Sequence, residues 1–225
     1  MITHTQKEHQ NELKRLAAQR AVEFVPHGEV IGIGTGSTVN FFIEALAQEP
    51  GLIKGAVPTS AKTTQMLKRY DIPVVSLSDV NGLPVYVDGA DEINHSLQMI
   101  KGGGGALFQE KLVANVSDRF ICIADEGKYV SRLGEFPLPV EVVPVARSYV
   151  ARQLLKLGAQ PELRLDYITD NGNNILDCHQ FYVDMPLEVE NRISEIIGVV
   201  ACGIFAKRHA DMLILAADTG VEVIS

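Results

Sequence analysis

VIGIGTGSTVNFFIEALA, residues 30–47, decides the fold class of this chain. Its apolar start at 30–33 is typical of a short buried strand, the small residues at 34–37 of a tight turn, and residues 40–47 of a helix. Apolar runs and helical spacing repeat this order along the chain. We expect further strands at 56–60, 74–75, 85–87 and 120–124, and helices at 5–25, 62–69 and around 110–115. Strands alternating with helices predict an α/β fold with a doubly wound, mostly parallel sheet.

The alternation of strands and helices changes after residue 132, where Pro137, Pro139 and Pro144 interrupt it. The elements expected beyond this point are strand 140–143, helix 147–157, two strand-like runs around a polar turn at 169–174, helix 187–197 and strand 199–205. This βαββαβ order is typical of a small ferredoxin-like α+β unit. The last strands, at 212–216 and 221–224, are expected to rejoin the first sheet. The sequence therefore predicts one domain at 1–132 with 206–225, and a smaller one at 133–205.

Composition and charge narrow the classes of function. A formal charge of -8 without a basic stripe argues against a nucleic-acid partner. No stretch has the roughly 20 apolar residues that a membrane helix needs, so we expect no membrane segment. The three cysteines are far apart, which predicts neither disulfides nor a zinc site, and the six histidines show no ligand spacing. We expect a cytoplasmic protein with reduced, buried cysteines and no bound metal.

The turn at residues 32–38 is similar to a nucleotide-binding loop but lacks its key residues. The third glycine of a GxGxxG motif falls on Ser37, no GxxxxGK motif is present, and no acidic residue ends the second strand. What is left is a helix N-terminus with the hydroxyls of Thr35, Ser37 and Thr38, which suits a small phosphate. The alternative is a tight turn in which these side chains are ordinary helix caps.

A second group of polar residues follows the strand expected at 85–87. In DGADE, residues 88–92, Asp88 and Asp91 stand three positions apart with Gly89 and Ala90 between them. Ligands of open α/β sheets bind at this end of the strands. Two carboxylates there suit either the hydroxyls of a sugar or a divalent metal, and the lack of further ligands favours the sugar. The alternative is a helix cap with solvated acids.

Four consecutive glycines, residues 102–105, follow Lys101, and Glu110 lies in the helix beyond them. Such a run is costly to order and can present successive N–H groups to an anion. Proton abstraction next to a carbonyl needs a base and stabilisation of the enediolate oxygen, which a carboxylate, a lysine and N–H donors supply. Glu110 alone is typical of an exposed helix residue, but the combination favours a base. Lys128 and Lys14 are candidate phosphate contacts, although each alone is typical of a surface lysine.

Together these segments resemble the A-type ribose-5-phosphate isomerase family. The matching stretches are GIGTGSTVNFFIEAL at 32–46, YVDGADEIN at 86–94, MIKGGGGAL at 99–107, FICIADEGK at 120–128 and FPLPVEVVPVAR at 136–147. The resemblance implies a Rossmann-like main domain with a smaller ferredoxin-like lid, and commonly a homodimer. It also implies the interconversion of ribose 5-phosphate and ribulose 5-phosphate through a cis-enediolate, without metal or cofactor, in the non-oxidative branch of the pentose phosphate pathway.

The resemblance also implies roles for individual residues. Glu110 matches the base that moves the proton between C1 and C2, Asp88 the carboxylate that assists ring opening, and Asp91 a binder of sugar hydroxyls. Lys101 matches a residue that faces the reacting oxygens, together with the N–H groups of the glycines after it. The substrate-binding residues implied in this way are Thr35, Gly36, Ser37, Thr38, Asp88, Gly89, Ala90, Asp91, Lys101, Gly102, Gly103, Gly104, Lys128 and Lys14.

The chain departs from the family pattern at two positions, and two rival functions compete with it. Gly105 stands where the family has alanine, which loosens the turn, and Pro58 where it has serine, which removes an N–H near the expected site. One rival is a non-catalytic sugar-phosphate sensor, which should carry a helix-turn-helix that the first helix does not supply. The other is a magnesium-dependent enzyme that uses Asp88, Asp91 and Glu92.

Overall fold

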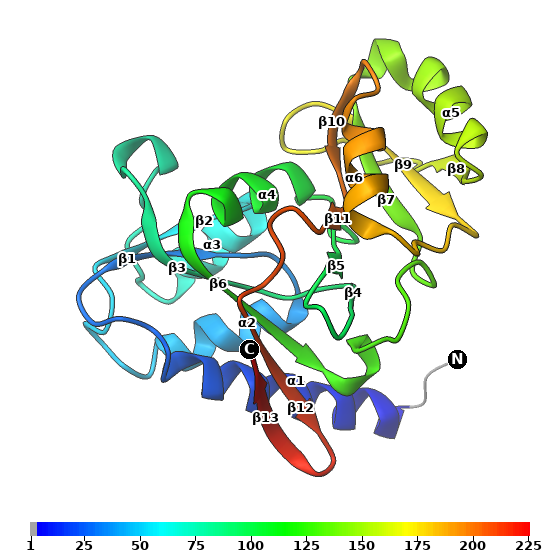
Figure 1. Ribbon diagram of the computed structural model, residues 1–225. Coiled ribbons are helices and arrows are strands. Elements are labelled where there is room, and N and C mark those ends of the chain that lie inside the picture. Colours follow the sequence, from blue (N-terminus) through cyan, green and yellow to red (C-terminus); the bar gives the residue numbers. More distant parts are fainter. Residues whose placement is uncertain (1–3) are drawn as a thin grey trace. The chain divides into compact units, whose positions relative to one another are not determined.

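The computed structural model describes residues 4–225, and the chain divides into two compact units (Figure 1). The first unit comprises Met1–Ala90, of which residues 4–90 are described, with Leu112–Tyr129 and Ala210–Ser225. The second comprises Asp91–Lys111 and Val130–His209. Each unit has its own principal sheet and its own hydrophobic core.

The first unit is built on a six-stranded sheet in the order β13-β12-β6-β3-β1-β2. Its strands are β1 (Val30–Ile33), β2 (Gly55–Pro58), β3 (Leu83–Asp88), β6 (Ser117–Asp125), β12 (Met212–Ala217) and β13 (Gly220–Ile224). All neighbouring pairs are parallel except β12 with β13. The predicted mostly parallel sheet is confirmed, and the last two strands rejoin it as expected.

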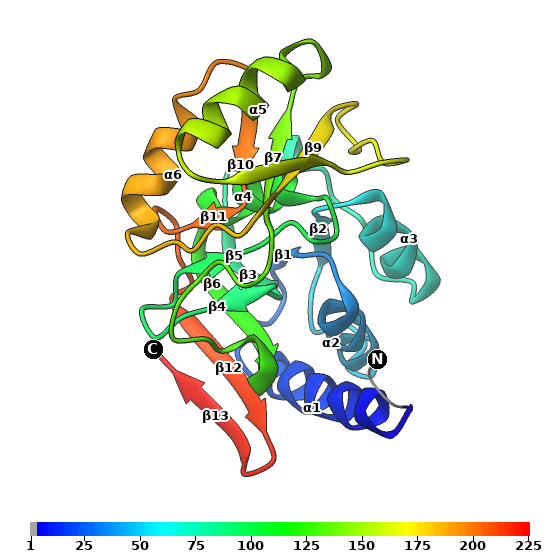
Figure 2. The same cartoon turned by 90° about the vertical axis from the view of Figure 1, so that its right-hand side faces the viewer.

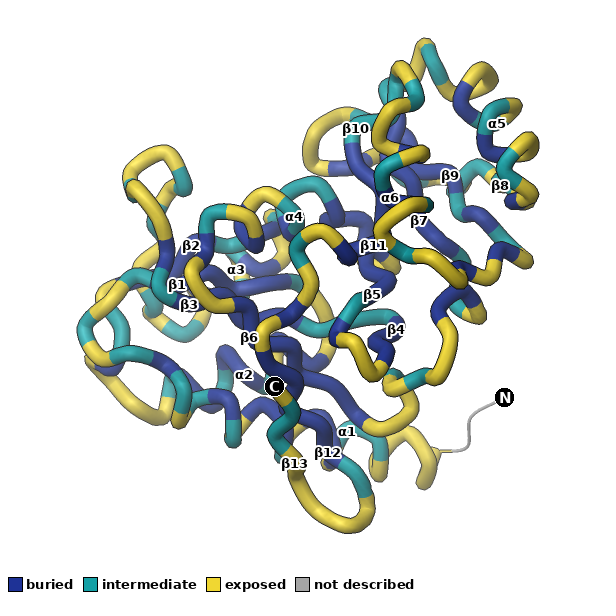
Figure 3. Tube along the Cα trace, in the orientation of Figure 1, coloured by how far each residue is buried: buried dark blue, intermediate teal, exposed yellow. Residues whose placement is uncertain are grey.

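Helices α1 (His4–Val22), α2 (Ser37–Leu46) and α3 (Ala61–Arg69) belong to the same unit. The apolar residues that predicted α1 and α2, among them Ala17, Phe42 and Ile43, are buried in one core with Ile31 and Ile33 of β1. Figure 3 shows β1, β3 and β6 largely in the dark blue of buried residues. Strands buried in this way are nearly continuous in apolar residues, which is why the sequence revealed them.

Two local elements of the first unit differ from the prediction. The strand expected at 74–75 is wrong: Val74 makes only an isolated bridge to Ala56, and the 3-10 helix η1 (Leu77–Asp79) follows at once. Pro73 has no N–H with which to extend a ladder, so the pairing stays a single bridge. Helix α2 begins at Ser37 rather than at 40, because Gly36 with φ 136° ends the turn earlier.

The second unit contains a four-stranded antiparallel sheet in the order β10-β7-β9-β8. Its elements in chain order are β7 (Leu138–Val142), η3 (Pro144–Ala146), α5 (Arg147–Lys156), β8 (Gln160–Leu163), β9 (Asn174–His179), α6 (Pro186–Ser194) and β10 (Val199–Cys202). This is the predicted βαββαβ order. Helices α5 and α6 lie on one face of the sheet (Figure 2), where Val150, Leu154 and Ile193 are buried against the strands.

A three-stranded antiparallel sheet, β11-β5-β4, was not predicted. It consists of β4 (Glu92–Ile93), β5 (Met99–Ile100) and β11 (Ile204–Phe205), and strands of two residues carry no readable period. This sheet ties residues 91–111, which were predicted in the first domain, to the second unit. Helix α4 (Leu107–Asn115) begins in the second unit and ends in the first, and η2 (Glu126–Lys128) follows β6. The exact domain boundaries stay a prediction.

Cys122, Cys178 and Cys202 are buried and free, as the sequence predicted. Burial raises the pKa of the Cys202 thiol to about 11 and also raises the pKa of the Cys178 thiol. Both thiols are therefore protonated and unreactive at neutral pH. Among residues 4–225, no helix is long and apolar enough to cross a membrane.

Candidate active site

Asp88 is a fully buried carboxylate at the carboxyl end of β3 in the first unit. Its Oδ1 accepts hydrogen bonds from the backbone N–H of Thr35 at 3.1 Å and of Gly89 at 2.7 Å, and its Oδ2 accepts from the Tyr86 hydroxyl. Burying a charge is costly unless donors replace water, and these three donors do so. The carboxylate thereby connects the end of β3 to the turn after β1.

Gly34 permits this connection because it has no side chain. A Cβ at this position would lie 1.9 Å from both Cγ and Oδ1 of Asp88. The Gly34 N–H donates to the carbonyl of Val87 at 2.9 Å, which holds the two strand ends together. The sequence indicated a tight turn here, but not that its glycine makes room for a buried carboxylate.

The Thr35 side chain is held by three hydroxyls that the sequence did not single out. Thr35 Oγ1 lies 2.9 Å from Thr59 Oγ1, 2.8 Å from Ser60 Oγ and 3.1 Å from Thr63 Oγ1. Ser60 is also the N-cap of α3, where its Oγ accepts from the Thr63 N–H at 3.1 Å. This cluster follows the end of β2, and the neighbouring Pro58 leaves it intact.

The N-terminus of α2 directly follows Thr35. Gly36 is the N-cap residue, and no side chain caps the helix. Thr35, Ser37 and Thr38 are therefore not the caps that the alternative interpretation assumed. The backbone N–H groups of the first turn have no acceptor within the helix, which makes this terminus suitable for an anion.

Lys14 and Lys128 lie near the carboxyl end of β6 in the first unit. Lys14 is 9% exposed, so it is not the solvated surface lysine of the alternative interpretation. Desolvation is the main cause that lowers the pKa of Lys14; Asp125 opposes it, while Lys128 and Lys7 lower the pKa further. Asp125 is the last residue of β6 and Lys128 follows in η2, so one predicted phosphate contact, Lys128, is among the charges that lower the pKa of the other, Lys14.

Lys101 and Glu110 form a buried ion pair in the second unit. Lys101 Nζ lies 3.3 Å from Glu110 Oε2, and each side chain is only 3% exposed. Lys101 follows β5, where its N–H donates to the Gly203 carbonyl at 2.9 Å, and Glu110 lies in the first turn of α4. The interpretation of Glu110 as an exposed helix residue is wrong. A carboxylate kept away from water beside a cation is an arrangement typical of acid–base chemistry.

The tetraglycine turn, residues 102–105, lies between β5 and α4 in the same unit. Gly102 and Gly105 have φ of 104° and 80°, and the Gly105 N–H donates to the Gly102 carbonyl at 2.9 Å. Backbone of this kind favours glycine. The Gly103 N–H, expected to face a substrate oxygen, donates instead to Asp91 Oδ2 at 2.7 Å. Asp91, predicted to bind sugar hydroxyls, is thus joined to the tetraglycine turn.

Glu92 has a structural role in the second unit. It is 4% exposed, and its carboxylate accepts from the N–H groups of Gly134 at 2.6 Å and Phe136 at 2.5 Å. Both oxygens of this carboxylate are therefore occupied by backbone donors. Within residues 4–225, no three His, Cys, Asp or Glu side chains are grouped as they would be around a metal ion.

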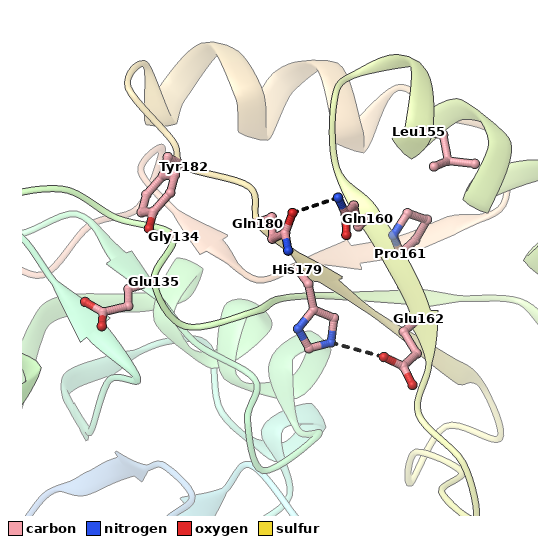
Figure 4. Close-up of a pocket in the computed structure, with 9 residues that line it drawn as sticks. All are labelled: Gly134, Glu135, Leu155, Gln160, Pro161, Glu162, His179, Gln180 and Tyr182. Carbon is pink, nitrogen blue, oxygen red and sulfur yellow. Dashed lines mark hydrogen bonds and ion pairs between the residues drawn. The ribbon is translucent and has the colours of Figure 1, made fainter.

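An open groove of about 590 Å³ lies elsewhere on the second unit (Figure 4). Its lining residues are Gly134, Glu135, Leu155, Gln160, Pro161, Glu162, His179, Gln180 and Tyr182, none of which was predicted to be functional. His179 and Glu162 pair across 3.6 Å, but their side chains are 43% and 76% exposed. Exposed pairs of this kind interact weakly, so the candidate chemistry stays with the buried residues described above.

Comparison with known proteins identifies the family. The family model for ribose 5-phosphate isomerase A (phosphoriboisomerase A) matches residues 55–220. A ribose-5-phosphate isomerase A of Neisseria meningitidis serogroup C is 62% identical over 215 residues, which are 96% of each chain. This chain belongs to the ribose 5-phosphate isomerase A family. The crystal structure of the Neisseria gonorrhoeae ribose 5-phosphate isomerase A matches with a TM-score of 0.94 at 62% identity, covering 96% of each chain. A ribose 5-phosphate isomerase A from Methanocaldococcus jannaschii matches with a TM-score of 0.90 at 38% identity, covering 95% of this chain and 98% of the other.

In this isomerase A family member, the predicted residues are divided between the two units. The first unit holds Lys14, residues 35–38, residues 88–90 and Lys128; the second holds Asp91, residues 101–104 and Glu110. The sequence missed Thr59, Ser60 and Thr63. A serine before a predicted helix is a capping signal, so Ser60 was within reach of sequence reasoning. The hydrogen bond between Ser60 and Thr35 could not be predicted in this way, because the two residues are 25 positions apart.

Proposed function

We propose that this family member interconverts ribose 5-phosphate and ribulose 5-phosphate through a cis-enediolate. The observation that carries the proposal is the buried pair of Lys101 and Glu110, with 3.3 Å between Nζ and Oε2, beside the tetraglycine turn. Moving a proton between adjacent carbons needs a base that is shielded from water. It also needs a positive charge that stabilises the oxygen on which negative charge develops. The substrate is neither oxidised nor reduced overall, so the proposal needs no redox cofactor.

The proposed proton transfer is balanced within one sugar. In the open-chain aldose, Glu110 removes the C2 proton, the C2–H electron pair forms the C1=C2 bond, and the carbonyl electrons move to O1. Lys101 stabilises the negative charge on O1. Glu110 then returns the proton to C1, while the O2 proton moves to O1 and C2 becomes the ketone. One carboxylate therefore acts first as base and then as acid.

The remaining proposed roles belong to the other predicted residues. Asp88 accepts the O1 proton as the bond between C1 and the ring oxygen O4 breaks, and the same proton is then delivered to O4. The N–H groups at the start of α2 and the hydroxyls of Thr35, Ser37 and Thr38 bind the phosphate, with Gly36, Lys14 and Lys128. Gly89, Ala90, Asp91 and residues 102–104 contact the sugar. A homodimer and a cytoplasmic location stay predictions.

The direct test is to mix the purified chain with ribose 5-phosphate in EDTA and to follow the ribulose 5-phosphate formed. We expect full activity with EDTA, and no stimulation when magnesium replaces the chelator. Activity that appears only with magnesium would favour the rival metal enzyme. Tight binding of ribose 5-phosphate without turnover, measured by calorimetry, would favour the rival sensor.

We expect Lys14→Met to raise KM about 10-fold or more while kcat changes little, because a charged hydrogen bond to phosphate is lost. The lowered pKa of Lys14 adds a pH dependence. A neutral amine does not attract phosphate, so KM of the parent rises with pH as Lys14 loses its proton, at a pH below that of an exposed lysine. Lys14→Arg should remove this rise. The matched control is the exposed Lys68→Met, and a KM profile shared by all variants would contradict the role of Lys14.

A further inference from the structure

Arg164, which follows β8 in the second unit, contacts the backbone of the tetraglycine turn. Its Nη1 donates to the carbonyl of Gly102 at 3.3 Å and to that of Gly103 at 3.2 Å. Four glycines have no side chains with which to hold a conformation, so their order must come from bonds to the backbone. Arg164 supplies two such bonds from a residue about sixty positions away in the sequence.

Asp177 on β9 holds the Arg164 guanidinium in place. Arg164 Nε donates to Asp177 Oδ2 at 2.8 Å and Nη2 donates to Oδ1 at 2.5 Å, which is a two-point contact between planar groups. The two side chains are 18% and 19% exposed. A two-point pair has one geometry, so the direction of Nη1 toward the turn is set by β9.

By binding the carbonyls of the turn, Arg164 also sets the direction of the N–H group in each of these peptides. In a trans peptide the carbonyl and the next N–H point in opposite directions. With the Gly102 carbonyl on Arg164, the Gly103 N–H points to Asp91 Oδ2, to which it donates at 2.7 Å. With the Gly103 carbonyl on Arg164, the Gly104 N–H is likewise turned away from the guanidinium. A positive charge on the carbonyl side also strengthens the N–H as a donor.

The segment after Arg164 makes a third bond to the turn. The Tyr167 hydroxyl donates to the Gly104 carbonyl at 3.1 Å, so three successive carbonyls of the turn are bound. A Cβ at Gly105 would lie 1.9 Å from the Tyr167 hydroxyl oxygen, so the glycine that departs from the family pattern makes room for this contact. Gly105 therefore permits the contact with Tyr167, in addition to the loosening of the turn that the sequence predicted.

Glu141 fixes the same segment from within the unit. This β7 residue is fully buried, and its Oε1 accepts from Thr169 Oγ1 at 2.9 Å, Asn171 Nδ2 at 3.0 Å and Asn173 Nδ2 at 2.9 Å. Asn171 Oδ1 in turn accepts from Gln109 Nε2, one residue before Glu110, at 3.2 Å. The polar turn predicted from the sequence is thus bound to Glu141 of β7 and to Gln109 of α4.

We propose that Arg164, held by Asp177, is a positioning residue for the isomerisation. It sets the direction in which Gly103 and Gly104 present their N–H groups, and through Gly103 it orients Asp91. The proposal rests on the isomerase function proposed above. It gives Arg164 no contact with the substrate; its effect passes through the peptides of the turn.

Kinetics of three variants test this role. Arg164→Met keeps the length of the side chain but removes its donors, and we expect kcat to fall about 10- to 100-fold while KM changes less than about threefold. Arg164→Lys keeps the charge without the planar fork, so we expect it to restore only part of kcat. The matched control is Arg192→Met, on α6, which carries a 57% exposed arginine and should retain the parent kcat. A kcat for Arg164→Met within twofold of the parent, per mole of folded protein, overturns the proposal.

A second readout does not depend on activity. In chain labelled with 15N-glycine, the amide signals of Gly103 and Gly104 should move in Arg164→Met and stay in place in Arg192→Met. Unchanged signals overturn the positioning role even if the kinetics change. If the parent chain shows no isomerase activity, the proposed function fails, while these signals still decide whether Arg164 orders the turn.

Discussion

Glu110→Gln is expected to lower kcat by about 10³-fold, because the substitution keeps the shape of the side chain but removes the base. Glutamine cannot take the C2 proton, so the enediolate does not form at a useful rate. KM should change little, since the phosphate and hydroxyl contacts belong to other residues. The loss corresponds to about 4 kcal/mol of transition-state stabilisation. The measurement is steady-state turnover of ribose 5-phosphate by the purified variant.

Two controls separate lost chemistry from lost structure. Glu110→Gln removes one charge of a buried ion pair, which can lower the stability of the fold, so thermal unfolding of the variant must be compared with the parent. The exposed Glu188→Gln, on α6, removes a carboxylate of which 53% is exposed, and should leave kcat and unfolding unchanged. If Glu110→Gln is folded and its kcat stays within a few fold of the parent, another residue is the base.

Asp88→Asn is expected to lower kcat/KM for ribose 5-phosphate about 100-fold or more. The carboxylate oxygens accept three hydrogen bonds, from Thr35, Gly89 and Tyr86. An amide offers one accepting oxygen and one NH2 group, so either the NH2 group faces the N–H groups of Thr35 and Gly89, or the Tyr86 hydroxyl turns to accept from it. In both cases the variant loses the acceptor for the O1 proton and changes the hydrogen bonds around the turn after β1.

Deuterium exchange distinguishes the role of Asp88 from that of Glu110. Ribulose 5-phosphate cannot close a five-membered ring through O5, which carries the phosphate, so its C1 proton can be removed without ring opening. In D2O, Asp88→Asn should still introduce deuterium at C1 of ribulose 5-phosphate, and Glu110→Gln should not. The label is followed by proton NMR. Equal loss of exchange in both variants would show that Asp88 acts in proton transfer rather than in ring opening.

The burial of Lys101 and Glu110 is not explained by stability alone. Taking two charges out of water costs free energy that their attraction often only repays, and apolar residues of similar volume would serve a fold as well. Both side chains are 3% exposed, next to a glycine-rich turn that also adds little to a core. Features that cost stability are expected at functional sites, which is the physical argument for placing the chemistry here.

Much of the fold was predictable because it depends on local pattern. Residues 30–33 are β1 as predicted, and the βαββαβ order of the second unit follows from runs and turns that lie close together in the chain. The prediction failed where the local sequence pattern does not indicate the secondary structure. The two-residue strands β4, β5 and β11 carry no period, and Val74 is apolar without becoming a strand.

In the candidate site, too, some features were predictable from the sequence and others depend on tertiary structure. The sequence by itself determined which residue types stand beside the tight turns: the glycines, the aspartates of DGADE, Lys101 and Glu110. Only the tertiary structure decided their contacts: that Gly34 makes room for Asp88, that Thr35 meets Ser60, and that Arg164 reaches Gly102 across 62 positions. Contacts between distant positions depend on strand register and on how closely two backbones approach. Neither quantity is encoded in the spacing of neighbouring residues.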